Sequence, residues 1–286
     1  MSQESMPESK TAEAPDLRIV PIDRIIPHEL EDEQRAEPLI RRLPIDGVLK
    51  NPPIVTTLDA PDDPYVILDG TNRVTALNAL HYEHALVQVV RYEEPFVELH
   101  TWNHVVTGID SLEIRHRFDA LVGLEIQSAD AFHAKAALAR RAILAYCLLS
   151  TGQVLALAGG GLDLMERTRV LASVVATYLD THLHRTNLDR LDKIRALYPD
   201  MGAAIIFPKY EPIEILDLSE AGLPVPTGIT RHVIHGRVLR LNYPLDRLSA
   251  NIPLNEKNRE LQLWVQDHFA TKHVRYYAES TYLFDE

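Results

Sequence analysis

The sequence YVILDGTNRVTALNAL, residues 65–80, decides the fold of the chain around it. Its first four residues form an apolar run typical of a buried strand, and this run ends at Asp69-Gly70, a dipeptide typical of tight turns. After Arg73, apolar residues recur with the spacing of one helix face, at Val74, Leu77 and Leu80. The stretch therefore predicts a strand, a tight turn and a helix that opens at that turn.

The predicted turn carries groups that suit an anion. The first N–H groups of a helix are unpaired and its dipole is positive at that end, so phosphate binds there readily. Asp69 can hold a metal ion or a hydroxyl group, and Arg73 can donate two parallel hydrogen bonds to phosphate or carboxylate oxygens. The structural alternative is a polar turn in which Asp69 or Thr71 caps the helix.

The composition is typical of a soluble globular protein. The chain has 286 residues, of which 46% are hydrophobic and 24% charged, and this length suits one large domain or two modest ones. No apolar run approaches the roughly 18 residues that a membrane helix needs. Residues 1–16 are polar and acidic, unlike a signal peptide, and predict a disordered leader. The single cysteine, Cys147, excludes an internal disulfide and favours the cytoplasm.

Around the central stretch, the pattern predicts a compact mixed α/β unit of strand, helix, strand, strand, helix and strand. Besides 65–68, the strand-like segments are 17–26, 53–57 and 85–91. Helical spacing covers 30–43 and 74–81. Pro38 must then sit in a first turn or at a break of the first helix.

Beyond Tyr92 the pattern changes. It predicts an extended arm over 96–105, a hairpin over 143–160, a strand over 203–207, and helices over 111–123, 129–141, 162–182, 187–198, 212–221 and 256–269. A strand-like YLF follows at 282–284. Gly159 to Gly161 lack the Lys-Ser/Thr pair of a phosphate loop and predict a simple turn.

Two isolated residues are candidates for a small-molecule site. Glu29 follows Pro27-His28 after the first strand, where a carboxylate is commonly a helix cap or a solvated surface group. It becomes a candidate general base if it is partly buried beside a phosphate or metal site. Trp102 can form the apolar wall of a ligand site, and its structural alternative is a place in the core.

The run Thr230-Arg231-His232 offers a hydroxyl, a guanidinium and an imidazole in succession. Alternation along a strand would send Thr230 and His232 to one face and Arg231 to the other. All three then converge on one site only if the segment turns there. The 13 histidines of the chain also raise a metal or haem interpretation, but the close pairs lack a Cys/His framework.

Several motifs together resemble known proteins. VPIDRIIPHE (20–29), PPIV (52–55) and the central stretch resemble the N-terminal domain of the ParB/sulfiredoxin-like superfamily. PHE at 27–29, DGTNR at 69–73, HTW at 100–102 and VPTGITRHVIHGRVLRLNYPL at 225–245 are similar to one branch, the free serine kinases. The segment from Trp264 onward resembles the tail of the members found in siderophore gene clusters.

The resemblance implies the reaction ADP + L-serine → AMP + O-phospho-L-serine with Mg²⁺, and ATP or another nucleotide is the alternative donor. It implies that Glu29 is the catalytic base and that Asp69 lies near the reacting hydroxyl and Mg²⁺. The turn that grips the diphosphate would be Gly70, Thr71, Asn72 and Arg73. The residues around serine or phosphoserine would be Trp102, Thr230, Arg231 and His232. Asn72 departs from related turns, which commonly carry His there; it can donate a hydrogen bond but cannot carry charge, which affects nucleotide preference or rate.

The same resemblance implies a division of the chain. It comprises a leader (1–15), a ParB/sulfiredoxin-like nucleotide-binding domain (16–110), a second mixed α/β domain that completes the serine site (111–250), and a helix and strand extension (251–286). Thr71 stands where a sulfiredoxin would carry its turn cysteine, which argues against sulfiredoxin chemistry.

Two other functions remain open on the sequence. One is a kinase for another hydroxy amino acid, such as homoserine or threonine. The other is a ParB-like regulator that binds DNA and responds to haem or nucleotide. The net charge of −12 and the lack of a helix-turn-helix with a basic recognition face disfavour DNA. Small-molecule partners, no membrane and a cytoplasmic location are expected, and the oligomeric state is not predicted.

Overall fold

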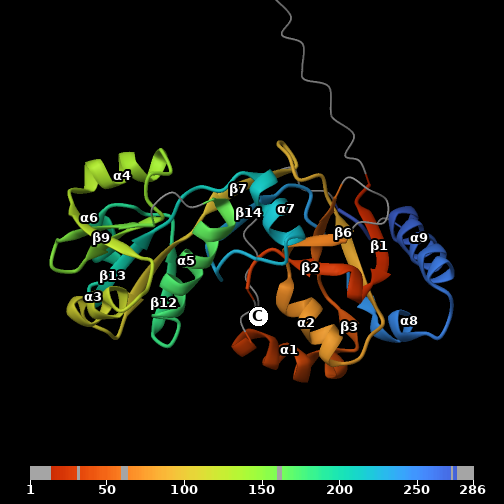
Figure 1. Cartoon of the computed structure of the whole chain (residues 1–286). Helices are drawn as coiled ribbons and strands as arrows, with labels where there is room; N and C mark the ends of the chain where they lie inside the picture. The colour runs from red at the N-terminus through yellow and green to blue at the C-terminus, as the bar shows by residue number, and fades with distance from the viewer. Residues whose placement is uncertain (1–13, 31–32, 59–63, 160–162, 272, 276–286) are drawn as a thin grey trace, which may run out of the picture.

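The computed structural model describes residues 14–30, 33–58, 64–159, 163–271 and 273–275. Within them the chain forms two lobes, each built on one β-sheet, with strands β7 (Val97–Thr101) and β14 (Thr230–Ile234) between them (Figure 1). This arrangement confirms the mixed α/β fold class. No helix of the described residues is both long and apolar enough to cross a membrane.

The sheet of the first lobe contains the central strand. Its order is β1 (Asp16–Pro21), β6 (His84–Val89), β4 (Ile54–Thr57), β5 (Tyr65–Asp69) and β2 (Ile25–Pro27). Antiparallel and parallel pairs alternate across it. The middle of β5 is almost fully buried, with Val66, Ile67 and Leu68 at most 3% exposed. A continuous apolar run is the pattern expected of a strand that is covered on both faces.

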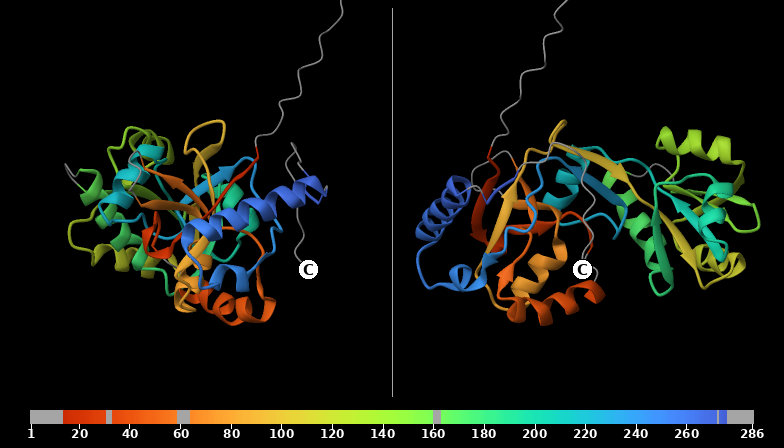
Figure 2. Two further views of the ribbon diagram at one scale, coloured as in Figure 1. Left: turned by 90° about the vertical axis from the view of Figure 1, so that its right-hand side faces the viewer. Right: turned by 180° about the vertical axis from the view of Figure 1, so that it is seen from behind.

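Helices from both ends of the chain cover this first sheet. Helices α1 (Glu33–Asp46) and α2 (Thr71–Ala79) pack against each other, and α9 (Leu254–Ala270) lies along β1 (Figure 2). The short elements of this lobe are η1 (Ile22–Arg24), β3 (Val48–Leu49), β15 (Tyr243–Pro244) and α8 (Leu245–Ser249). The C-terminal segment therefore contributes to the core of the N-terminal lobe through Tyr243 and Leu261, each at most 1% exposed.

The sheet of the second lobe is antiparallel throughout. Its order is β12 (His182–Thr186), β8 (Asn103–Thr107), β13 (Met201–Ile206), β10 (Ala145–Leu149), β11 (Val154–Ala158) and β9 (Glu125–Ala129). Its helices are α3 (Ser111–Asp119), α4 (Ala131–Ala139), α5 (Leu164–Ala176), α6 (Leu191–Leu197) and α7 (Pro212–Glu220). Successive residues of β13 point to opposite faces of the sheet, so that Ile205 belongs to one hydrophobic core and Ile206 to another. The sheet is thus buried on both faces, as side-chain alternation along a strand allows.

The connection between the lobes passes through Trp102. Strand β7 pairs with β14, whereas β8, which begins one residue after Trp102, belongs to the six-stranded sheet. The backbone N–H of Trp102 donates to the carbonyl of Ile229 at 2.7 Å. A second link is the parallel bridge between Glu29 and Val225. The ends of several strands therefore meet between the lobes.

Most predicted elements are confirmed. The single strand predicted over 17–26 is wrong, because β1 and β2 are separate strands that lie at opposite edges of the first sheet. The helix predicted over 162–182 ends at Ala176, and the strand β12 that follows is not predicted. The predicted arm over 96–105 is two strands in different sheets, and the helix predicted over 187–198 begins at Leu191. The expectation that Pro38 sits in a first turn or at a break is wrong, since Pro38 lies inside α1 (Glu33–Asp46).

Other expectations remain untested. The leader, the tip of the acidic turn at 59–63, part of the glycine run and the YLF segment lie outside the described residues. The boundaries proposed at 110 and 250 stay a prediction. Strand β8 belongs to the sheet of the second lobe although it lies before the boundary proposed at residue 110.

Candidate active site

All ten site residues expected from the sequence line one cavity between the lobes. Its volume is about 740 Å³, within the range of roughly 300–1,000 Å³ typical of small-molecule sites. The cavity is lined by Glu29, Asp69, Gly70, Thr71, Asn72, Arg73, Trp102, Thr230, Arg231 and His232 from the selected set, joined by His28, Arg185 and Arg237. Five segments far apart in the sequence therefore converge on one space: 28–29, 69–73, 102, 185 and 230–237.

The turn after β5 has the conformation expected of a helix start that can receive an anion. Gly70 is the N-cap of α2, with φ of 98° in the left-handed region, and it makes no side-chain capping bond. A Cβ added there would lie 2.6 Å from Nη2 of Arg73. The structural alternative, in which Asp69 or Thr71 is the cap, is wrong, because Asp69 pairs with arginines instead.

Asp69 is held between two guanidinium groups. Its Oδ2 accepts a hydrogen bond from Nη2 of Arg73 at 2.8 Å and one from Nη1 of Arg237 at 2.6 Å. Burial by itself would raise the pKa of Asp69, but the two arginines outweigh it and hold the pKa below its usual value. Asp69 is therefore ionised at neutral pH.

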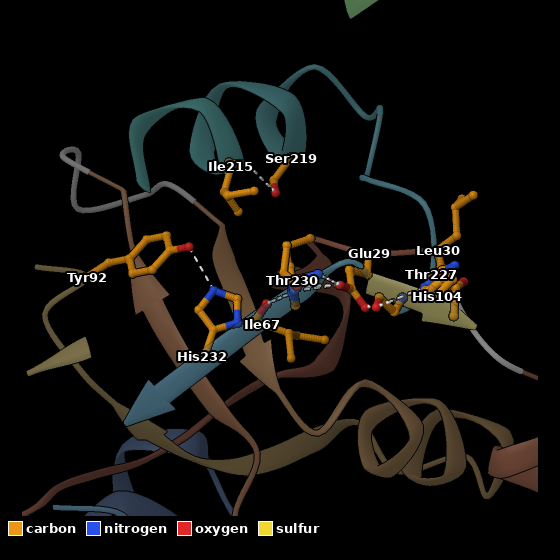
Figure 3. Close-up of polar contacts among 12 residues, drawn as sticks. Glu29, Leu30, Ile67, Tyr92, His104, Ile215, Ser219, Thr227, Thr230 and His232 are labelled. Atoms are coloured by element: carbon orange, nitrogen blue, oxygen red, sulfur yellow. Dashed lines mark hydrogen bonds and ion pairs between the residues drawn. The ribbon is translucent and has the colours of Figure 1, made fainter. Parts of the chain in front are cut away.

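Glu29 is neither a helix cap nor a solvated surface group. It follows strand β2, and its side chain is 15% exposed. Its carboxylate accepts hydrogen bonds from the backbone N–H of Gly228 at 3.0 Å and of Thr230 at 2.6 Å, and from the Thr230 hydroxyl (Figure 3). These three donors orient the carboxylate at the cavity wall.

The Thr230 hydroxyl also contacts a buried histidine. Nε2 of His28 lies 2.7 Å from Oγ1 of Thr230, and Nδ1 of His28 contacts the carbonyl of Ile67. Because a carbonyl oxygen only accepts, Nδ1 must carry a hydrogen. Burial lowers the pKa of His28, and neighbouring Glu29 opposes that shift. The single hydrogen of the Thr230 hydroxyl is donated to Glu29, and the same hydroxyl oxygen lies against Nε2 of His28. The candidate base and a buried histidine therefore meet at one threonine.

The other two members of the 230–232 run face different neighbours. The Tyr92 hydroxyl lies 2.7 Å from Nε2 of His232, whose pKa is lowered well below its usual value by burial (Figure 3). The guanidinium of Arg231 stands 4.5 Å from the centre of the Trp102 ring, a cation–π geometry. The segment is the regular strand β14, and its side chains alternate as expected: Thr230 and His232 both contact His28, whereas Arg231 contacts Trp102. All three residues nevertheless line the cavity.

Three basic lining residues were not predicted from the sequence: His28, Arg185 and Arg237. His28 stands beside Glu29 in the quoted PHE motif, and this position was the sequence signal that could have identified it as a site residue. Arg185 lies in the unpredicted strand β12. Arg237 follows β14 and lies in the quoted motif at 225–245, which was the available signal for it.

The charge of the cavity is opposite to that of the chain. Its described lining holds four arginines, at positions 73, 185, 231 and 237, against the two carboxylates of Glu29 and Asp69. The formal net charge of the chain is −12. The positive cavity attracts a small anionic ligand, whereas the negative charge of the whole chain repels a large polyanion such as DNA.

A buried histidine of the second lobe fixes the loop that holds Glu29. Nε2 of His104 (Figure 3) lies 3.1 Å from the carbonyl of Gly228. Its Nδ1 lies 3.1 Å from the Tyr178 hydroxyl. His104 is 0% exposed, and burial lowers its pKa to about 4. The imidazole is therefore neutral in the folded protein and links the two lobes through Gly228.

This shift predicts acid destabilisation. Above pH 6.5, His104 is neutral in the folded and the unfolded chain, so it has no effect on the free energy of unfolding there. As the pH falls from 6.5 to 4, the unfolded chain binds a proton that the folded chain excludes, and the loss reaches about 3 kcal/mol. His104→Gln should flatten that part of the urea unfolding free energy against pH. The exposed His116→Gln is the control, and parallel curves for wild type and His104→Gln would refute the effect.

No protein-family model matches the chain. Two curated proteins are similar in sequence. One is the ATP-dependent L-serine kinase SbnI of Staphylococcus aureus, 28% identical over 277 residues that cover 94% of this chain and 97% of that protein. The other is an ATP-dependent L-serine kinase of Staphylothermus marinus, 29% identical over 90 residues, 32% of this chain and 35% of that protein.

Solved structures are similar over most of the chain. SbnI of S. aureus with a C-terminal truncation has a TM-score of 0.67 at 22% identity and covers 88% of this chain and 97% of its own. A free serine kinase in complex with AMP has a TM-score of 0.69 at 21% identity, with coverage of 85% and 98%. A mutant free serine kinase in complex with ADP has a TM-score of 0.68 at 20% identity, with the same coverage. These likenesses establish the fold.

Proposed function

We propose that this chain is a phosphotransferase that acts on free L-serine and transfers a phosphoryl group from an adenine nucleotide to the serine hydroxyl. The observation that carries the proposal is the convergence of Glu29 and the turn at 69–73 on one cavity. The relatives named ATP-dependent L-serine kinase, one of them similar over 94% of this chain, support it. The product is O-phospho-L-serine.

The terminal phosphates of the nucleotide lie at the N-terminus of α2. The unpaired N–H groups there and the Arg73 guanidinium neutralise phosphate charge. Glu29 takes the proton from the serine hydroxyl while the serine oxygen bonds to the terminal phosphorus and the bond to the bridging oxygen of the nucleotide breaks. Phosphoryl transfer depends mainly on positioning and on charge neutralisation, both of which this cavity can supply.

The amino-acid substrate occupies the part of the cavity between Glu29 and Trp102. Trp102 forms its apolar wall, and Arg231 above the ring faces the substrate carboxylate. Thr230 and His232 complete the same wall from strand β14. Asn72 replaces the histidine that is common in related turns, so the phosphate is bound there without an additional charge.

Magnesium fits the site as a partner of the nucleotide. Mg²⁺ is commonly held by one or two carboxylates together with substrate phosphates. Among the described residues, no group of three or more His, Cys, Asp or Glu side chains could hold a metal ion by itself. Asp69 is the carboxylate of the turn, so it would hold Mg²⁺ jointly with phosphate oxygens. The ion would supply further neutralisation of phosphate charge.

The direct test is product formation. Purified protein is incubated with Mg²⁺ and L-serine plus either ADP or ATP, and the products are separated. Phosphoserine with AMP identifies ADP as the donor, whereas phosphoserine with ADP identifies ATP. Homoserine and threonine in place of serine test the choice of amino acid. Absence of phosphorylated amino acid with both donors would refute the proposed function.

The remaining assignments stay predictions. They are the ParB/sulfiredoxin-like relationship of the first lobe, the division into domains, and a role in siderophore biosynthesis. The resemblance of the quoted motifs supports them.

The Thr230 hydroxyl provides a more specific prediction. Thr230→Val removes a hydrogen bond to the Glu29 carboxylate, and bonds to charged groups contribute about 1.5–3 kcal/mol. We therefore expect kcat to fall about 10- to 100-fold, whereas Thr230→Ser, which keeps the hydroxyl, should retain most of the activity. The matched control is Thr168→Val, which removes a buried hydroxyl bonded within helix α5. Equal kcat for the valine and serine variants at position 230 would contradict the role.

A further inference from the structure

Asp69, Arg73 and Arg237 form an ion cluster in the cavity, and the sequence did not predict that Arg237 contacts Asp69. Both guanidiniums donate to the same oxygen, Oδ2 of Asp69, at 2.8 and 2.6 Å. Arg237 is 168 residues away from Asp69 in the sequence. Two guanidinium groups that converge on one anionic oxygen form the arrangement with which proteins bind phosphate.

The backbone on both sides of Arg237 is fixed by one buried side chain. Gln88 of strand β6 is 3% exposed. Its Nε2 donates to the carbonyl of Gly236 at 2.9 Å, and its Oε1 accepts from the N–H of Val238 at 2.9 Å. A surface ion pair needs no such support, since exposed pairs contribute little to stability. The support is instead typical of a side chain that must be held in position for binding.

The guanidinium of Arg73 is held by a second hydrogen bond besides the one to Asp69. Its Nη1 donates to the carbonyl of Asn51 at 3.2 Å, while Nη2 donates to Asp69. Its side chain is 20% exposed, compared with 32% for Arg237 and 38% for Asp69. All three side chains line the cavity beside the N-terminus of α2. The cluster therefore lies where the proposed function places the nucleotide phosphates.

We propose that Arg237 is a phosphate-binding residue and that the Asp69 carboxylate occupies its guanidinium and that of Arg73 until a phosphate displaces it. This inference rests on the proposed function only for the identity of the natural ligand. A terminal phosphate carries about −1.5 to −2 charge at neutral pH, compared with −1 for a carboxylate. Phosphate therefore competes successfully for the two arginines, and the displaced Asp69 becomes available to the Mg²⁺ that accompanies the nucleotide.

The proposal predicts opposite effects for two substitutions. Asp69→Asn removes the internal competitor, so ADP and inorganic pyrophosphate should bind about two- to fivefold more tightly without Mg²⁺, a modest gain because the cluster is partly exposed. Arg237→Gln removes a ligand and should weaken both by about tenfold or more. Adenosine, which has no phosphate, should bind equally well to both variants and to wild type.

The experiment is calorimetric titration of the full chain in EDTA with ADP, pyrophosphate and adenosine. Arg240→Gln is the matched control, since Arg240 is an exposed arginine of the same segment. Weaker pyrophosphate binding by Asp69→Asn would overturn the competition, because it would make Asp69 a structural support of the turn. Unchanged pyrophosphate and ADP binding by Arg237→Gln would overturn the assignment of Arg237, and this variant suffices if Asp69→Asn does not fold.

The titration also separates this inference from the proposed function. If pyrophosphate shows the predicted pattern while serine is not phosphorylated, the inference stands and the kinase proposal fails. If wild type phosphorylates serine while the Arg237 and Asp69 variants bind ADP and pyrophosphate as wild type does, the kinase proposal stands and the inference fails.

Discussion

Glu29→Gln is expected to lower the rate of phosphoserine formation by about 10²- to 10⁴-fold, the usual contribution of a positioned general base. The amide of glutamine cannot take the proton of the serine hydroxyl. Its oxygen can still accept one of the hydrogen bonds that Gly228 and Thr230 donate to the carboxylate. The loop should therefore stay close to its position, and the loss should appear in kcat rather than in nucleotide affinity.

The measurement is single-turnover formation of phosphoserine at saturating nucleotide and serine, together with equilibrium binding of ADP. The control is Glu37→Gln, which changes an exposed glutamate of α1 that pairs with Arg41. A glutamine variant that retains more than about a tenth of the wild-type rate would exclude Glu29 as the base. A variant that loses ADP binding to the same extent as its rate would instead make Glu29 a structural residue.

Gly70→Ala is expected to weaken ADP binding by about tenfold or more and to lower stability. Alanine at a φ of 98° costs about 1–2 kcal/mol. Its Cβ would also lie 2.6 Å from Nη2 of Arg73, so the guanidinium must leave its position beside Asp69. Charge-assisted bonds of that kind contribute about 1.5–3 kcal/mol each, which sets the expected loss of affinity.

Gly222→Ala separates the two causes. Gly222 also has a positive φ, of 66°, but nothing lies within 4 Å of an added Cβ there. Both variants should therefore show a lower Tm, whereas only Gly70→Ala should bind ADP more weakly. Equal ADP affinity of the two variants would show that the turn at 69–73 does not hold the nucleotide.

The strand–turn–helix at the centre of the first lobe was predictable because its signals are local. An apolar run, a D-G dipeptide and helical spacing determine the conformation of the residues that carry them. β5 (Tyr65–Asp69) and α2 (Thr71–Ala79) accordingly appear within two or three residues of their expected bounds. The hairpin of β10 and β11 was predictable for the same reason.

Strand β12 shows where local patterns fail. Its sequence HLHRT follows a strongly helical segment, and its histidines and arginine give no apolar alternation of the usual kind. It becomes a strand through its antiparallel pairing with β8, which is some 75 residues earlier in the chain. Pairing of this type depends on where the rest of the sheet lies, and Arg185 reaches the cavity as a consequence.

By itself, the sequence determined the mixed α/β class, the central turn and the residue types that could bind phosphate and take a proton. The tertiary structure alone decided that Glu29 accepts hydrogen bonds from a loop 199 to 201 residues later, and that Arg237 joins Arg73 on Asp69. The physical reason is that short-range spacing encodes the conformation of single elements. The packing of two sheets decides which of their ends face one another.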